Sequence, residues 1–240
     1  MATELDERLS LFEPLLDELA TMFCPSESWS AETPDDPGLD AYERCEIKRL
    51  KIGEACAADR GAVREHADQI MRAIAHDHNP SGNRQLIEPL VRSIGARQVM
   101  ERVLGYLETG LAAEKLGAAM AWYWAVPSLR YATMEELRAD LDGQSSDEGA
   151  IRVSLSPRTP TPADNNAEVR ALYRHLQPRF RIGCLRAFVA SNSPEESRYL
   201  SYQFSLNLSD YPPELHAEVE AAARIVTADP EQYRNGSPSR

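Results

Sequence analysis

VLGYLETGLAAEKLGAAMA, residues 103–121, contains the pattern that decides the fold. An apolar helix end is followed by a short polar turn, and a second helix begins at Glu114-Lys115. LRAFVASNSPEESRYLSYQ, residues 185–203, repeats this order further along the chain, with its second helix led by Glu196. Helix pairs of this kind cannot bury their apolar faces alone, so the repetition predicts stacked helix pairs.

The same helical period extends outward from this segment over most of the chain. Apolar residues recur at steps of three and four, which gives each helix one apolar face. The pattern predicts helices at 3–23, from 39 onward, and at 60–76, 83–94, 96–109, 112–125, 134–141, 167–177, 180–190, 194–206 and 212–227. The expected fold class is therefore all-α, with about nine or ten helices.

Two segments lack this period. Residues 24–38 contain three prolines and no apolar repeat, which is typical of an irregular loop. Residues 142–166 are rich in Pro, Ser and Thr and predict one long loop or insertion, with a single candidate strand at 151–155. We expect one all-α repeat domain over 1–233 and a disordered tail at 234–240.

The run EKLGAAMAWYW, which starts at Glu114, resembles the second helix of a HEAT-like repeat. Residues 83–125 and 168–233 also resemble a group of uncharacterised bacterial HEAT-like proteins, whereas 1–60 and 142–166 depart from that pattern. The resemblance implies an α-α superhelix, an α-solenoid. It implies no activity, because no activity is known for that group.

Composition narrows the class of partner and the compartment. The formal net charge of −12 disfavours nucleic acid and anionic membranes, because phosphate binding requires a positive contact surface. The first residues, MATELDERLSLFEPLL, lack the features of a signal peptide, and no apolar run is long enough to span a bilayer. Four widely spaced cysteines predict reduced thiols. We expect a cytoplasmic protein with no membrane association.

The strongest local charge feature is residues 169–194, which contain several arginines and no acid. Such a face could hold a phosphate, a carboxylate or an acidic partner segment. The alternative is that its arginines pair with acids on adjacent helices. The binding candidates are Arg170, Arg174, His175, Arg179 and Arg181.

Three consecutive aromatic residues, Trp122, Tyr123 and Trp124, could form either a ligand-binding wall or part of the core. Successive residues of a helix point about 100° apart, so the three rings cannot form one flat surface. We expect them to belong mainly to the core, with Trp124 as the one ring that reaches a concave face and therefore as a further binding candidate.

Motifs for catalysis or metal binding are weak. His76, Asp77 and His78 could ligate a metal, but no third or fourth ligand lies nearby in sequence, so no metal and no cofactor are expected. DNA glycosylases that act on alkylpurines are HEAT-like enzymes of similar length, and an acid such as Asp140 or Asp142 beside the tryptophans would imitate their arrangement. No residue-by-residue match supports carrying over their catalytic residues.

We therefore expect a non-enzymatic protein-interaction module, either an adaptor or an immunity- or antitoxin-like binder. Its partner would be a protein, with a basic surface favoured by the acidic chain and by the acids of 135–148. An anionic ligand at the arginine stretch remains open. The alternative is a HEAT-like enzyme that acts on a nucleic acid or an anionic small molecule.

Overall fold

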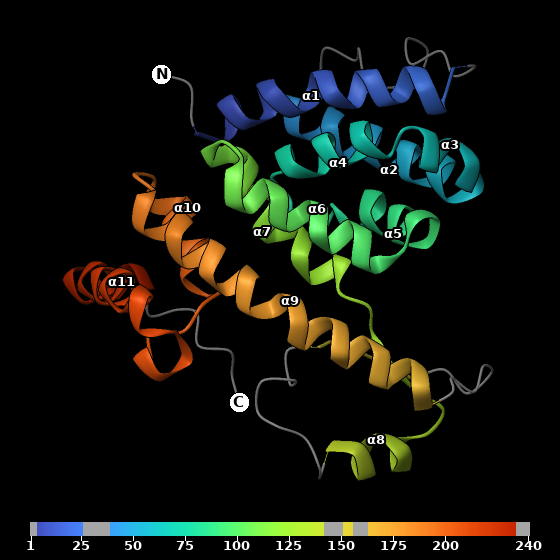
Figure 1. The fold of residues 1–240 in the computed structure, drawn as a ribbon. Coiled ribbons are helices and arrows are strands. Elements are labelled where there is room, and N and C mark those ends of the chain that lie inside the picture. Colours follow the sequence, from blue (N-terminus) through green and yellow to red (C-terminus); the bar gives the residue numbers. More distant parts are fainter. Residues whose placement is uncertain (1–3, 26–38, 142–150, 156–162, 234–240) are drawn as a thin grey trace.

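The computed structural model describes residues 4–25, 39–141, 151–155 and 163–233, and it is predominantly helical in these ranges (Figure 1). Most of the predicted loop at 24–38, most of the loop at 142–166 and the tail at 234–240 lie outside the described residues. The described part contains no helix long and apolar enough to cross a membrane. The helical class expected from the apolar period is confirmed.

The helices follow one another closely in sequence. The N-terminal half contains α1 (Glu4–Phe23), α2 (Ala41–Ala58), α3 (Arg60–Glu65), α4 (Ala67–His76) and α5 (Arg84–Ile94). The central part contains α6 (Ala96–Thr109), α7 (Ala112–Ala125) and α8 (Met134–Leu141). The C-terminal part contains α9 (Ala163–Ala190), α10 (Pro194–Ser201), α11 (His216–Ala228) and α12 (Pro230–Tyr233).

Helices from successive parts of the chain pack side by side around one continuous apolar core (Figure 1). At the top of the view α1 lies against α2 and α4, and α7 lies between α4 and α9. The two segments matched in sequence both form a helix, a short turn and a second helix, α6–α7 and α9–α10. The starts of the two second helices are stabilised differently: the Glu114 side chain accepts from Leu111 N, whereas at α10 the Ser193 hydroxyl accepts from Glu196 N.

Small residues allow α7 to approach α4 closely, as the composition of its first half predicts. A Cβ atom added at Gly117 would lie 1.9 Å from the carbonyl oxygen of Ala75. Leu116 and Ala118 beside it are buried. The central helix is therefore packed on more than one side.

A small parallel sheet joins the helical part at one end, and it departs from the all-α expectation. Strand β1 (Leu129–Tyr131) pairs with β2 (Val153–Leu155), with Leu129 opposite Val153 and Arg130 opposite Ser154. The candidate strand at 151–155 is confirmed, while β1 was not predicted. Consequently, residues 142–166 are not one continuous loop, because they contain β2 and the first turn of α9.

Helix boundaries also differ in three places. The helices predicted at 167–177 and 180–190 are one helix, α9, despite Pro178 inside it. Proline removes one backbone donor, but Leu176 and Phe180 are buried on either side of it, and this packing outweighs the lost hydrogen bond. The predicted helix 60–76 is broken at His66, and α10 ends at Ser201, well before residue 206.

Candidate functional site

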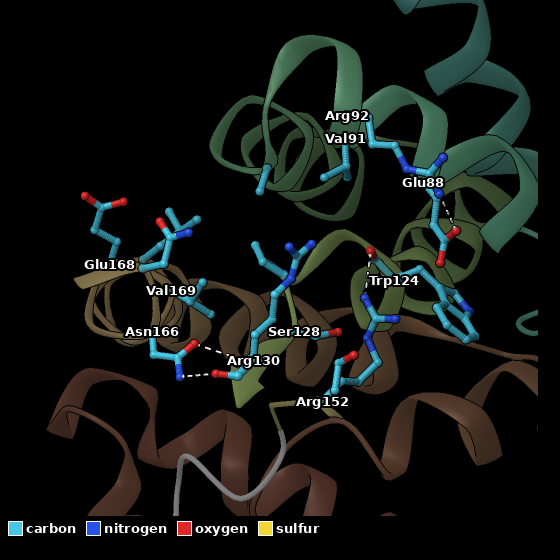
Figure 2. Close-up of a pocket in the computed structure, with 15 residues that line it drawn as sticks. Glu88, Val91, Arg92, Trp124, Ser128, Arg130, Arg152, Asn166, Glu168 and Val169 are labelled. Carbon is cyan, nitrogen blue, oxygen red and sulfur yellow. Dashed lines mark hydrogen bonds and ion pairs between the residues drawn. The ribbon is translucent and has the colours of Figure 1, made fainter. Parts of the chain in front are cut away.

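A pocket of about 500 Å³ lies where α5, the end of α7, the two strands and the start of α9 meet (Figure 2). We call it the sheet pocket. Its lining is polar and charged on the sheet side and carries a tryptophan on the α7 side. The residues that line it are Glu88, Val91, Arg92, Ala96, Trp124, Pro127, Ser128, Arg130, Arg152, Ser154, Asn165, Asn166, Glu168, Val169 and Leu172.

The two strands place two arginines in this pocket through their alternation. Successive side chains of a strand point to opposite faces, so Ser128 and Arg130 share one face, and Arg152 and Ser154 share the same face of the neighbouring strand. The intervening Leu129 is buried on the other side. Figure 2 shows Arg130 and Arg152 pointing from the strands into the pocket, below Glu88 and Arg92 of α5.

Arg152 is held in one orientation by the end of α7. Its Nη2 donates to the carbonyl oxygens of Val126 (2.9 Å) and Trp124 (3.3 Å). The guanidinium carbon lies 4.7 Å from the ring centre of Trp124 and 5.1 Å from that of Tyr123, within the range of cation–π attraction. Both contacts orient the side chain before any ligand arrives.

The charge of Arg152 is incompletely compensated. Within the described part of the chain, no carboxylate forms an ion pair with it, and its Nε is buried without a hydrogen-bond partner. Burial lowers the pKa of this guanidinium from its ordinary value, because the charged form loses solvation. A preordered cation of this kind favours an anionic acceptor.

Arg130 is positioned through its backbone, and its side chain is exposed. Asn166 of α9 accepts from Arg130 N (2.9 Å) and donates to Arg130 O (2.8 Å), which ties the sheet to α9. The guanidinium forms no ion pair within the described residues. On the opposite wall, Arg92 is paired with Glu88 at 3.0 Å, so these two charges largely balance each other.

The aromatic triplet divides between core and pocket. Trp122 is buried, stacks on Phe180 with ring centres 4.4 Å apart, and donates to Gln177 Oε1 at 2.9 Å. Trp124 is half-buried, reaches the sheet pocket and donates to the carbonyl oxygen of Pro80 at 2.7 Å. Tyr123 is exposed, so the expectation that Trp124 is the one ring of the three outside the core is wrong. That Trp124 faces the concave side of a solenoid stays a prediction.

The ring of Trp124 already has cationic neighbours. Besides Arg152, the guanidinium carbon of Arg84 lies 5.3 Å from its ring centre. A ring-shaped ligand that stacked on Trp124 would have to compete with these contacts. At Trp124, the aromatic wall considered for ligand binding is therefore engaged within the protein.

Of the arginine stretch at 169–194, three side chains pair with acids on three different helices. Arg170 bonds Asp140 of α8 and donates to the Tyr131 hydroxyl at 3.0 Å, and Arg170 is largely buried. Arg179 makes a bidentate pair with Glu108 of α6, with both oxygens at 2.9 Å from Nη2.

Arg186 lies 3.3 Å from Glu218 of α11 and completes this group of three. The remaining candidates differ in exposure: Arg174 and His175 are exposed, and Arg181 is half-buried. The pairings match the alternative in which arginines of this stretch bond acids on adjacent helices. Asp140, considered as a glycosylase-like carboxylate, is one of those acids, and Asp142 lies outside the described residues.

Each side chain of the His76-Asp77-His78 run contacts different neighbours. His76 Nε2 lies 3.5 Å from Glu114, and Asp77 pairs with Arg49 at 2.9 Å. His78 is buried between the rings of Phe12 and Tyr42, and burial lowers its pKa to about 4. Within the described part of the chain, no cluster of three or more His, Cys, Asp or Glu residues could hold a metal.

The pocket arginines were not predicted from the sequence. The signal that could have found them is the alternation in two short segments, Ser128-Leu129-Arg130 and Arg152-Val153-Ser154, one of which was recognised as a candidate strand. Unless β1 is known to pair with β2, the sequence does not tell on which face of a sheet the Arg152 side chain lies. The pairing joins segments more than twenty residues apart, and short-range periodicity does not report it.

Comparison of the chain with protein-family models, with curated proteins and with solved structures finds no match. The function is therefore argued from the geometry of the site.

Proposed function

We propose that this chain is a non-enzymatic protein-interaction module, an adaptor or an immunity-type binder, whose partner contacts the sheet pocket. One observation carries the proposal: Tyr123, Trp124 and Arg152 form a half-exposed cluster at the pocket edge. Tyrosine, tryptophan and arginine are the residue types that contribute most of the binding energy at protein interfaces. The wider scaffold is proposed to be a HEAT-like α-α superhelix.

The geometry around the cluster supports this function. Arg152 is held by two backbone carbonyls, and Asn166 ties the sheet to α9, so little ordering is needed on binding. Pre-organised groups lose less conformational entropy when they bind and therefore give higher affinity. The net charge of −12 favours a partner whose surface as a whole is basic.

An enzyme on the same scaffold receives less support. Its ring-binding wall would be Trp124, whose ring contacts Arg84 and Arg152. A hydrolytic site would need a nucleophile beside a base, and the described lining of the pocket contains serines but no histidine or cysteine.

A photo-crosslinking residue placed at Ser128 of the full chain tests the proposal in native cells. We expect it to capture a discrete protein, which is then purified and mixed with the wild-type chain to measure a dissociation constant. The matched control carries the crosslinker at Glu220, an exposed residue on α11. Capture of the same protein by both positions, or of none by Ser128, would count against the pocket as the contact.

A further inference from the structure

We infer that the sheet pocket binds a carboxylate group, presented by an acidic segment of a protein partner or by a free dicarboxylate. The inference rests on the proposed function for the first of these two sources. It is carried by the placement of two guanidiniums, Arg130 and Arg152, on one face of the β1–β2 sheet.

The charge balance of the pocket favours a single oxyanion. Three arginines line it against two glutamates, and the Arg92–Glu88 pair neutralises one charge of each sign. Arg152 and Arg130 then remain against Glu168, which lies on the α9 wall. One net positive charge matches a carboxylate better than a phosphate dianion, because buried or half-buried charge is stable only when it is compensated.

The geometry of Arg152 also favours a planar acceptor. Its Nη2 donates to the carbonyls of Val126 and Trp124, and the cation–π contact with Trp124 holds the guanidinium beside the ring. A guanidinium offers donors in one plane, and carboxylate oxygens accept them in that plane. The exposed Arg130 guanidinium can move onto the second oxygen, since among the described residues Asn166 bonds its backbone and no ion pair holds its side chain.

Uncharged donors complete the site. Ser128 and Ser154 project from the same sheet face, and the amide of Asn165 lies on the α9 wall. Each can donate a hydrogen bond to a carboxylate oxygen without adding charge. The pocket lining therefore supplies both charged and neutral hydrogen-bond donors.

The test uses the full chain and the side-chain indole signal of Trp124 in a two-dimensional NMR spectrum, assigned with Trp124→Phe. The Trp124 Nε1 donates to Pro80 while its ring contacts Arg152, so a change at Arg152 alters this signal. Four additives are titrated to millimolar concentration: succinate, a short acetylated glutamate peptide, the matching glutamine peptide and inorganic phosphate.

We expect saturable shifts with succinate and the glutamate peptide, and none with the glutamine peptide. Tighter binding of the peptide assigns the carboxylate to a protein segment, and tighter binding of succinate assigns it to a free dicarboxylate. Phosphate binding tighter than both carboxylates, or no saturable shift with either carboxylate, would overturn the inference.

Variants locate the site. Arg130→Gln is expected to weaken carboxylate binding by about tenfold, the typical effect of losing one charged hydrogen bond. Arg179→Gln removes another exposed arginine, whose partner is Glu108, and it should leave binding unchanged. An equal loss in both variants would show that the ligand is attracted by overall charge and that the pocket is not its site.

Arg152→Gln is the direct test, and its folding is checked by circular dichroism because Arg152 also joins the sheet to α7. If it does not fold, Arg130→Gln still decides the question, since the Arg130 side chain is exposed. Capture of a partner at Ser128 without carboxylate binding would leave the proposed function in place and reject this inference. Carboxylate binding without capture of a partner at Ser128 would support this inference and count against the proposed function.

Discussion

The guanidinium of Arg49 and the carboxylate of Asp77 form a completely buried ion pair, with 2.9 Å between Nη1 and Oδ1. Asp77 begins the turn between α4 and α5 and also accepts from Asn79 N at 2.9 Å. Gly82 makes room for the guanidinium, because a Cβ atom there would lie 1.8 Å from Nη2 of Arg49. The pair therefore joins α2 to the α4–α5 turn.

Asp77→Asn should destabilise the protein by about 3 kcal/mol, because among the described residues it leaves the buried Arg49 with the half-buried Glu46 as its one ion-pair partner. Urea unfolding followed by circular dichroism measures the change. Arg97→Gln is the matched control, since Arg97 forms only an exposed pair with Glu101, and it should change the unfolding free energy by less than about 0.5 kcal/mol. Equal stability of the two variants would contradict this role for Asp77.

Glu13 should make the protein sensitive to acid. Hydrogen bonds from Arg44 and Lys48 lower its pKa from 4.5 to about 2. A lowered pKa means that the folded state favours the ionised form, so the stabilisation is present above pH 4.5 and is lost as the pH falls toward 2. Glu13→Gln should therefore lower stability at pH 7 by about 1 to 2 kcal/mol, after allowance for solvent screening.

The measurement for Glu13 is the unfolding midpoint at several pH values between 7 and 2. The wild type and Glu13→Gln should converge as the pH falls through this range. A constant difference between the two proteins at all pH values would show that the Glu13 contacts do not depend on its charge.

Gly117→Ala should destabilise the protein by about 1 to 3 kcal/mol, the usual cost of overpacking a core. The added methyl group would meet the backbone oxygen of Ala75, and backbone atoms cannot rotate away. Gly105→Ala on α6 is the matched control, because nothing lies within 4 Å of its added Cβ. Alanine is the better helix former, so this control should gain about 0.5 to 1 kcal/mol. Thermal melts of both variants decide the point, and a stabilised Gly117→Ala would reject close approach of α4 and α7.

The Arg179–Glu108 pair should contribute little to stability, although its geometry is bidentate. Both side chains are substantially exposed, and exposed pairs are screened by water and salt. A double-mutant cycle with Arg179→Ala and Glu108→Ala should give a coupling energy below about 1 kcal/mol. A coupling of several kcal/mol would mean that this arginine is held for a structural reason that exposure does not reveal.

Short-range patterns predicted the helices well because amphipathic periods are local. The α7 packing was predictable from Gly117 and its small neighbours, whereas the exposure of Tyr123 was not. The continuity of α9 was not predicted, because burial of Phe180 and Leu176 outweighs the local effect of Pro178.

The sheet pocket was missed for a different reason. Arg130 and Arg152 lie on the same face of the sheet because two distant segments pair as strands, and no local period in the sequence predicts this pairing. The arginine stretch was more conspicuous in the sequence, but Arg170 and Arg179 find acids only once α8 and α6 are placed beside α9. The density of arginines in the sequence therefore indicated residues 169–194 and not the sheet pocket.

On the two strands, the residues proposed to select the ligand differ from the residues that form the apolar core. Ser128, Arg130 and Ser154 face the pocket, and the apolar core that holds the helices together does not include them. Substitutions at these three positions are expected to change the ligand that the proposed site accepts while the helical core keeps its composition. Laboratory evolution of new binders can therefore begin with libraries restricted to these positions.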